Sequence, residues 1–582
     1  MLNPVASTFG PVGPSLLRML LLCLLGSLLP AQVPPGEAEE LRRRAQEEAE
    51  QRQRREQAPN IRLQEPVPAT EDEESLVLPV ESPSFPITRL VLELPEDYPA
   101  RLRAGAASGA LGAPFWFAQS YLNRYQGRQV GSEGLNLIVR RLTRRIIRRG
   151  YTTTRVGLPE QDLARGTLRV TLFPGIIEAI RFADPALGGT WRTAFPARAG
   201  DLLNLRDLEQ GLEQMKRLPS QDVDIAIQPG TRPGESEVIL SVRRGSPWKI
   251  LVGGDNAGAR ATGEWQGNLQ LAWDNPLGLS DLFSGSLSHD VTAYRRGSGT
   301  RGASLFYSVP MGYWTFTGSW NSYDYVQRFT GYQDFVSNGR SQNLEFRVGY
   351  LFYRDQNRKE TLQLRTGKRQ SRSFLDHTEI EVQHQDTSFV ELSLLHLQYL
   401  GPAQLDVVAS HRRGVPWFGT KVNPIGCEPG GPTFFYQLNT LEATLTVPFA
   451  GLCYSATLRG QHTRDQLYGV DYLSLGNRWT VRGFDGEQTL GSECGAFIRN
   501  DLVCPLGQRA PALYLGVDVG RVYGSNDPFL PGHSLSGIVL GLKGALGSGG
   551  AFDLFLGGAL HQPEHFRQHG LVCGISASFR IL

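Results

Sequence analysis

The sequence predicts a membrane protein of the all-β class, in which an N-terminal helix and two small α/β units precede a transmembrane barrel of roughly 16 strands. The first observation is a period-two alternation of apolar and polar residues from Trp248 to the end of the chain. The second is the lack, after the N-terminal segment, of any run of about 18 apolar residues, which a membrane-spanning helix needs. The third is an N-terminal segment with the features of a secretory signal.

Residues 1–31 are interpreted as a signal peptide. Arg18 precedes an apolar run, residues 19–29, that is too short to span a bilayer, and the small-residue site ends at Ala31. A buried core helix is the alternative, but the flanking arginine and the terminal position favour the signal peptide. We therefore expect the mature protein to leave the cytoplasm.

The mature chain is expected to begin with a charged helix and a linker. Residues 37–57 are nearly all Glu, Arg, Gln and Ala, which are good helix formers, and as a helix they extend roughly 30 Å. Their thin apolar stripe is typical of a solvated helix or a disordered tether. Residues 58–84 carry five prolines and an acidic run, so this segment cannot bury enough apolar area to offset its ordering entropy.

Two small β-α-β-β units are predicted in tandem, at 85–173 and 174–245. In each unit, a strand precedes a helix whose apolar residues recur every three or four positions. The first helix starts at Ser132, an N-cap candidate, and the second starts after Asn204. The expected strands are 87–94, 151–158 and 167–173 in the first unit, and 176–181, 223–228 and 237–243 in the second.

The first of these helices also carries an arginine-rich face. Such a face is typical of a solvated helix surface, although it could instead be an electrostatic patch for an acidic partner or for lipid headgroups. The residues alone leave both interpretations open. The face comprises Arg140, Arg141, Arg144, Arg145, Arg148 and Arg149.

The alternation after Trp248 favours a membrane barrel over a soluble sandwich. In residues 441–447, for example, Leu, Ala, Leu and Val alternate with Glu, Thr and Thr. Aromatic residues near the segment ends, turns rich in Gly, Asn and Asp, and the length of the repetition are typical of barrels, whereas sandwich runs are shorter. At about 10 residues per spanning strand plus loops, residues 246–582 accommodate roughly 16 strands.

One barrel strand carries an acid that has to face the lumen. The apolar side chains of residues 513–519 share one face, so Asp518 points the other way. An inward carboxylate in a pore is either hydrated or paired with a cation from a loop that folds into the lumen. The best local candidate for that cation is Arg482, because arginine and a carboxylate form a bidentate fork.

Composition and motif content argue against other classes. The net charge of +2 gives no sign of nucleic-acid binding. No cysteine or histidine spacing is typical of a metal site, and the Gly-rich residues 253–258 lead into alternation rather than a phosphate-binding helix, so no cofactor and no enzyme are predicted. A disulfide between Cys494 and Cys504 is a hypothesis that rests on their closeness in sequence. The mature cysteines are Cys427, Cys453, Cys494, Cys504 and Cys573.

Four sets of motifs follow one another along the chain: GYTTTR, LPEQDL and GTL within 150–168, DNPLGLSD at 274–281, VRGF at 481–484 and GVDVG at 516–520. In this combination the chain resembles the TpsB transporters of two-partner secretion, the FhaC/ShlB/HecB-like haemolysin secretion and activation proteins of the BamA/TpsB superfamily. The first set resembles the family's first POTRA domain, and the second resembles its first-hairpin motif. VRGF is similar to the motif at the tip of extracellular loop six, and GVDVG to the inner-wall aspartate segment that pairs with it.

The resemblance implies specific roles. The two α/β units would be periplasmic POTRA domains that receive an unfolded TpsA-type exoprotein by strand addition and groove contacts. The helix within 32–57 would plug the barrel. The implied lock of loop six in the lumen comprises Arg482, Gly483, Phe484 and Asp518. The candidates for substrate recognition are Arg140, Arg144, Arg148, Tyr151 and Gln161.

The resemblance also implies a location and partners. The barrel would lie in the Gram-negative outer membrane, contact its lipid and depend on the barrel assembly machinery, with no nucleic acid involved. It would secrete an adhesin, haemolysin or contact-dependent toxin without ATP, driven by folding of the cargo outside, and whether it also activates the cargo stays open. The chain departs from outer-membrane barrels in ending at Leu582 rather than at an aromatic residue. Alternatives are a BamA-like assembly factor, which normally has more POTRA units, and a passive porin or receptor, which lacks them.

Overall fold

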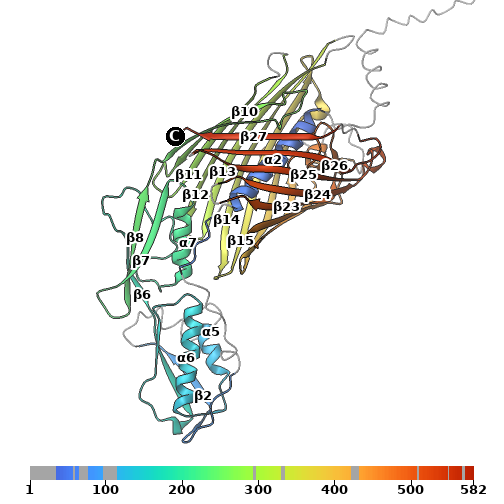
Figure 1. The fold of residues 1–582 in the computed structure, drawn as a ribbon. Helices are drawn as coiled ribbons and strands as arrows, with labels where there is room; N and C mark the ends of the chain where they lie inside the picture. The colour runs from blue at the N-terminus through green and yellow to red at the C-terminus, as the bar shows by residue number, and fades with distance from the viewer. Residues whose placement is uncertain are drawn as a thin grey trace, which may run out of the picture.

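The computed structural model describes residues 35–56, 59–63, 76–95, 114–292, 297–329, 334–420, 431–507, 510–547, 549–566 and 570–581. The predicted signal peptide, part of the linker and Cys427 lie outside these ranges. Along the chain, the described residues form one helix, two small α/β domains and a closed barrel (Figure 1). No helix among them has both the length and the hydropathy to cross a bilayer.

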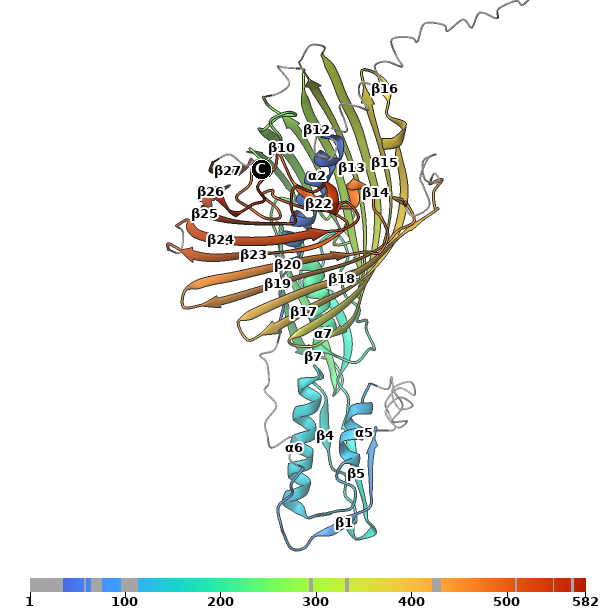
Figure 2. The same cartoon turned by 90° about the vertical axis from the view of Figure 1, so that its right-hand side faces the viewer.

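The predicted barrel of 16 spanning strands is confirmed for the described chain, and Figure 2 shows its strongly tilted wall. Neighbouring strands are antiparallel, and β9 closes the wall against β27. The short β16 (Thr378–Glu379) extends one hairpin. The spanning strands are β9 Trp248–Asp255, β10 Gln266–Asp274, β11 Leu282–Asp290, β12 Gly299–Met311, β13 Trp314–Phe329, β14 Phe335–Arg354, β15 Arg358–Leu375, β17 Gln385–Leu400, β18 Ala403–Val415, β19 Gln437–Phe449, β20 Leu452–His462, β23 Cys494–Pro505, β24 Ala512–Tyr523, β25 Ser534–Leu546, β26 Gly550–His561 and β27 Val572–Arg580.

The two faces of the wall follow the sequence alternation. In β24, exposed and buried residues alternate without a break from Leu513 to Tyr523. The exposed positions include Leu515 and Val519, whereas the buried positions between them include Asp518. Because lipid surrounds the outer face of a barrel and side chains or water fill the inner one, this phase makes the outside apolar and the lumen polar.

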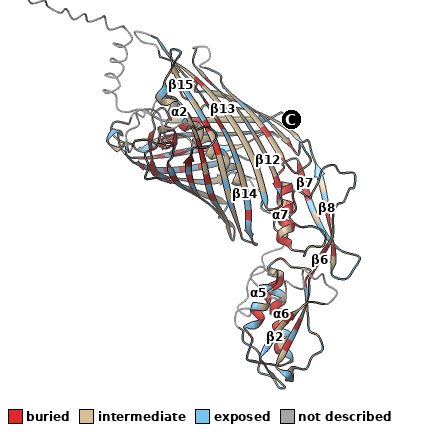
Figure 3. Cartoon of the chain, turned by 180° about the vertical axis from the view of Figure 1, so that it is seen from behind, coloured by how far each residue is buried: buried red, intermediate tan, exposed pale blue. Residues whose placement is uncertain are grey.

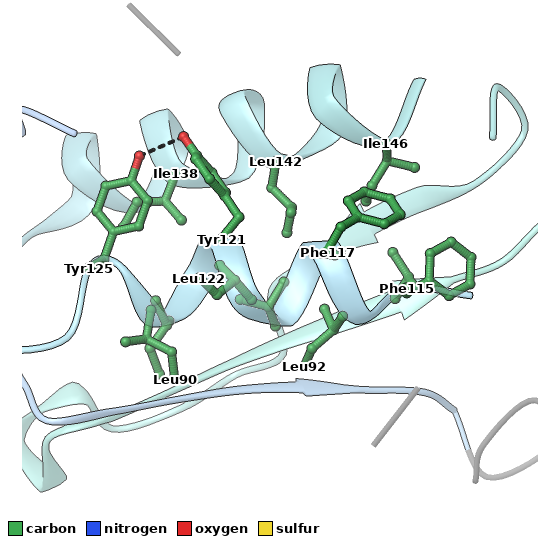
Figure 4. Close-up of a cluster of buried hydrophobic side chains, with 14 of the residues drawn as sticks. Leu90, Leu92, Phe115, Phe117, Tyr121, Leu122, Tyr125, Ile138, Leu142 and Ile146 are labelled. Atoms are coloured by element: carbon green, nitrogen blue, oxygen red, sulfur yellow. Dashed lines mark hydrogen bonds between the residues drawn. The ribbon is translucent and has the colours of Figure 1, made fainter. Parts of the chain in front are cut away.

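The first α/β domain packs two helices on one face of a sheet. In the sheet, β5 (Thr167–Phe173) lies between parallel β2 (Arg89–Glu93) and antiparallel β4 (Arg155–Gly157), and β1 (Phe85–Ile87) pairs with β3 (Arg128–Val130). Helix α6 (Ser132–Arg148) buries Ile138, Leu142 and Ile146, which are spaced four residues apart, against helix α5 (Trp116–Asn123) and the sheet (Figure 4). Helix α6 ends before Gly150, whose φ of +96° suits the left-handed turn after a helix.

Several features of the first domain differ from the sequence-based expectation: strand β3 was not predicted, and the expected strand 87–94 is divided into β1 and β2. Helix α5 was not predicted, because its eight residues are too short to show a helical period. The expected strand 151–158 is reduced to β4 (Arg155–Gly157). Ser132 is the first helical residue rather than the N-cap, which is Gly131 and offers no side-chain cap.

The second α/β domain lies between the first domain and the barrel (Figure 1). Its sheet has the order β6 (Ile176–Phe182), β8 (Glu235–Arg244), β7 (Gln221–Pro229). Helix α7 (Leu205–Lys216) begins where the Asn204 side chain accepts a hydrogen bond from Arg206 N, as the sequence predicts. Nine of its 12 residues are buried, because the helix lies between its own sheet and the end of the barrel that includes the turn between β12 and β13 (Figure 3).

Candidate functional site

The lumen of the barrel contains a helix. Helix α2 (Pro35–Glu56) runs through the interior of the barrel in both views (Figures 1 and 2). One end lies at the loop between β20 and β23, where Arg42 Nη2 donates to Gly486 O at 2.9 Å and Arg44 Nη1 donates to Asp471 Oδ1 at 2.9 Å. These contacts explain why a helix with so thin an apolar stripe is ordered: its partners are polar groups of the lumen.

The other half of helix α2 contacts the wall strands β19 and β20 through one carboxylate. Glu442 of β19 accepts hydrogen bonds from Arg52 (3.1 Å), from Arg55 and from Arg459 (3.3 Å), which belongs to the neighbouring β20. Arg459 also donates to Glu48 of the helix at 2.9 Å. A buried charge is costly unless it is paired, so the three arginines and two carboxylates hold one another in place.

The adjacent part of the luminal wall, formed by strands β14 to β18, carries further paired charges of both signs. Glu391 of β17 accepts from Arg365 of β15 and from Arg412 of β18, both at 2.8 Å. Arg365 also lies 3.6 Å from Glu345 of β14, whose second partner is Arg347 at 2.7 Å. The lumen is therefore lined by fixed charges of both signs, which favour water and polar chain over apolar side chains once the helix is absent.

Loop six, the segment between β20 and β23, folds back into the barrel and places its tip on β24. The structure brings Arg482 and Asp518 together: Nε donates to Oδ2 at 2.7 Å and Nη2 to Oδ1 at 2.8 Å. The Arg482 backbone N–H donates to the same carboxylate at 3.0 Å. A second acid, Asp501 of β23, lies 2.7 Å from Nη1. With 4 % and 1 % of their side chains exposed, Arg482 and Asp518 form a shielded bidentate pair.

The wall beneath the loop tip consists of glycines that the sequence analysis did not single out. A Cβ on Gly516 would lie 2.5 Å from Arg482 Nη2, and a Cβ on Gly537 would lie 1.9 Å from Arg482 O. In the tip itself, Gly483 has a φ of +94°, and a Cβ there would lie 2.4 Å from Gly558 O. We call Gly516 and Gly537 the glycine bed. The sequence does contain these glycines at inward-facing positions of the last strands, but only the structure shows that the loop tip packs against them.

Apolar side chains anchor the loop on either side of Arg482. Val481 and Phe484 are both buried in a cluster of nine buried residues from loop six, the wall and the loop between β26 and β27. Phe484 meets Phe566 edge to face with ring centroids 5.6 Å apart. Two short strands inside the loop, β21 (Leu473–Leu475) and β22 (Leu490–Ser492), pair with each other. The loop is thus a folded unit rather than an extended excursion.

Replacement of Gly537 by alanine is expected to lift the loop tip from the wall, because the new methyl group would overlap the backbone carbonyl of Arg482. The expected result is a severalfold increase in the rate at which external trypsin cleaves after Arg478 or Arg482, measured on intact cells. Gly318→Ala is the matched control, since a Cβ at Gly318 on β13 meets nothing within 4 Å. Equal cleavage rates in the two variants would show that the glycine bed does not hold the loop.

The structure separates the predicted recognition residues of the first α/β domain. Arg148 and Tyr151 line one cleft of about 1210 Å³ together with Tyr313 and Phe352 from the rim of the barrel. Arg140 and Arg144 are exposed and do not line this cleft. Gln161 is engaged within the domain, where its side chain donates to Arg169 O at 2.9 Å and accepts from Arg169 N at 2.7 Å.

Two expectations from the sequence are wrong. Arg141 does not belong to the outward arginine face, since only 1 % of its surface is exposed. Position 141 is three residues after the buried Ile138, so its side chain lies beside the apolar stripe of the helix. A disulfide between Cys494 and Cys504 is also excluded, since both are free and lie at opposite ends of the single strand β23, roughly 33 Å apart.

A buried ionic cluster docks helix α7 onto the barrel. Arg354, at the end of β14, donates to Glu213 Oε2 at 2.7 Å and to Gln210 Oε1 at 3.0 Å, and Lys359 of β15 donates to Glu213 at 2.7 Å. Arg354 also donates to Ile61 O at 3.1 Å, in the segment that follows helix α2. The segment that follows the lumen helix, the second α/β domain and the barrel rim therefore meet at one arginine.

Comparison with models of known protein families identifies the family to which this chain belongs. A model described as "Haemolysin secretion/activation protein ShlB/FhaC/HecB" matches residues 234–544, which is more than half of the chain. The chain belongs to this family. A POTRA domain model matches residues 176–229 and a ShlB-type POTRA model matches 108–175, so the two α/β domains are the first and second POTRA domains of a ShlB/FhaC/HecB-type protein.

Individual members of the ShlB/FhaC/HecB family agree with this assignment over almost the full length. The outer membrane transporter CdiB-2 of Burkholderia pseudomallei is 40 % identical over 562 residues, which cover 94 % of this chain and 95 % of that protein. The haemolysin transporter protein ShlB of Serratia marcescens is 31 % identical over 68 % of this chain and 71 % of its own. The solved structure of CdiB from Escherichia coli superimposes with a TM-score of 0.81 at 26 % identity, covering 95 % of this chain and all of that one.

The predicted family, fold class and location are confirmed. The protein is a two-partner secretion transporter of the outer membrane, with two POTRA domains ahead of the barrel on the periplasmic side. The family consists of transporters.

Proposed function

We propose that this transporter exports one TpsA-type exoprotein, an adhesin, haemolysin or contact-dependent toxin, through the lumen that helix α2 now fills. The observation that supports this most is the chemistry that holds the helix. It contributes no strand to the wall, and ion pairs and hydrogen bonds such as those of Arg44, Arg52 and Arg55 hold it there. When the helix leaves, water enters the lumen and solvates these charged groups, while β19 keeps its backbone pairs with β18 and β20, so the helix can leave without unfolding the barrel.

In this proposal, the POTRA domains receive the unfolded cargo in the periplasm. The short edge strand β4 (Arg155–Gly157) offers a place for strand addition, and the exposed Arg140 and Arg144, together with Arg148 and Tyr151 in the cleft, are the candidate contacts. Gln161 is less suited, because its amide already bonds Arg169. The pair of Arg482 and Asp518 locks loop six. Export needs neither ATP nor a catalytic group, and folding of the cargo outside supplies the driving force.

The test is deletion of the gene in its strain of origin, with complementation by the whole chain or by a chain that lacks residues 85–245. We expect deletion to remove one large protein from the medium or cell surface, and only the whole chain to restore it. The controls are the amounts of porins in the outer membrane, which should not change. A general loss of porins would instead indicate a barrel-assembly factor.

A further inference from the structure

Residues 76–84, which we call the strap, lie on the first POTRA domain alongside helix α6. Val77 lies beside the middle of the helix, where its carbonyl accepts a hydrogen bond from Arg141 Nη1 at 3.0 Å. Glu81 lies at the N-terminus of the helix, where its carboxylate accepts from Gly134 N at 2.7 Å and from Glu133 N at 2.8 Å. The strap therefore runs along helix α6 in the direction opposite to the helix.

The carboxylate of Glu81 supplies the cap that helix α6 lacks in its own sequence. Besides the two bonds above, it accepts from Gly131 N at 3.0 Å and lies 3.5 Å from Ser132 Oγ. A Cβ on Gly131 would lie 2.4 Å from Glu81 Cδ, so only glycine leaves room for the acid there. Burial alone would raise the pKa of Glu81, but the bonds from residues 131–134 outweigh it and hold the pKa below its ordinary value. The helix end is thus built to bind a carboxylate.

The rest of the strap binds as an extended peptide. Leu76 and Leu78 pack against the core of the domain, whereas Val77 and Val80 are 65 % and 105 % exposed. Arg141 has only 1 % of its surface exposed, and it also donates to Tyr125 Oη at 3.3 Å. A buried arginine that holds a backbone carbonyl, flanked by sites for two aliphatic side chains, is an arrangement suited to an extended chain rather than to one fixed loop.

We propose that this surface of helix α6 is a docking site for an extended segment of the exported protein, with two aliphatic side chains one residue apart followed by an acid, and that the strap is its displaceable resident occupant. This inference rests on the export function proposed above. The strap itself carries the pattern that the site takes, Leu-x-Leu-x-x-Glu at 76–81. Being part of the same chain, it binds at an effective concentration in about the millimolar range, so cargo has to present the same chemistry to replace it.

The test is binding of a fluorescein-labelled peptide with the sequence of residues 74–84 to the full-length transporter in detergent, followed by fluorescence anisotropy. The wild-type site is occupied, so we expect a chain with Leu78→Ser and Glu81→Gln to bind the peptide at least tenfold more tightly. Val80→Ser is the matched control in the strap and should behave like the wild type, because Val80 is exposed. A peptide in which the glutamate that corresponds to Glu81 is replaced by alanine should lose most of its affinity.

Two further measurements keep the result interpretable. Hydrogen exchange of Leu168 and Val170, buried in β5, reports whether the double variant keeps its POTRA core; if it does not, Glu81→Gln alone keeps both leucines and should show an intermediate gain. Equal peptide affinity in wild type and variants would overturn the docking site and leave the export function, which secretion tests, unaffected. The urea-unfolded exoprotein identified by gene deletion should displace the peptide, and failure to do so would overturn cargo as the occupant.

Discussion

Replacement of Asp518 by alanine is expected to lower secretion at least tenfold while the barrel still assembles. The change removes the partner of Arg482 and leaves a guanidinium with 4 % of its side chain exposed beside Asp501 alone. Breaking one side of a buried ion pair typically costs about 3–5 kcal/mol, because the remaining charge is left without its main partner. That cost falls on the docked position of loop six rather than on the wall, since β24 keeps its backbone pairs with β23 and β25.

Secretion is measured as the amount of exoprotein outside the cell, and assembly as the resistance of the folded barrel to SDS before boiling. Arg482→Lys is the informative companion variant: it keeps the charge but loses the fork that binds both oxygens of Asp518, so we expect an intermediate loss. Asp324→Asn is the control, because Asp324 pairs with the exposed Arg301 and Arg340 on β12 and β14. Full secretion by both Asp518→Ala and Arg482→Ala would remove the lock from the mechanism.

Deletion of helix α2, residues 35–56, should convert a nearly closed barrel into a permanently open channel. The helix occupies the lumen, and every wall carboxylate and arginine that it contacts becomes available to water when it is absent. In planar bilayers we expect the deleted form to show a steady conductance several times the time-averaged conductance of the whole chain. Cells that carry it should become sensitive to antibiotics that the outer membrane normally excludes.

A point variant refines the same prediction. Glu442→Lys places a cation among Arg52, Arg55 and Arg459, so the wall would repel the helix that it now holds. The open fraction should rise, and added salt should reduce the difference from wild type because it screens the repulsion in a hydrated lumen. Asp324→Asn again serves as the control acid outside the lumen. An unchanged conductance in Glu442→Lys would show that these pairs do not keep the helix in place.

The barrel and its inward acid could be predicted because successive side chains of a β-strand point to opposite faces, so that each face corresponds to every second residue. Asp518 lies among outward aliphatic residues, and this phase alone assigned it to the lumen. The partner Arg482 needed the motif as well, since nothing in local sequence says that a loop folds back. The same limit applies to Gly516 and Gly537: glycine in a strand is common, and only the position of the loop tip shows what approaches it.

The first POTRA domain shows where local patterns fail. Arg141 shares the sequence neighbourhood of Arg140 and Arg144, but its guanidinium bonds Val77 O, in a segment 64 residues away in the sequence. Likewise, Ser132 fits the statistical description of an N-cap, whereas the cap that forms is Glu81, 51 residues earlier. In both cases the hydrogen-bond partner comes from a distant segment instead of from a neighbouring residue. The sequence of helix α6 alone cannot reveal such a partner.

The contacts of helix α2 bear on the order in which the parts of the protein assemble. Arg42 and Gly486 are separated by 444 positions, and Arg52 and Glu442 by 390. Contacts of such high sequence separation form late, because the intervening chain loses entropy when its ends meet. The helix has no site until β19, β20 and loop six exist, although it is synthesised before all of them. We therefore expect each newly inserted molecule to pass through an interval as an unplugged pore, and the time its first residues take to reach the lumen to set how much solute leaks through it in that interval.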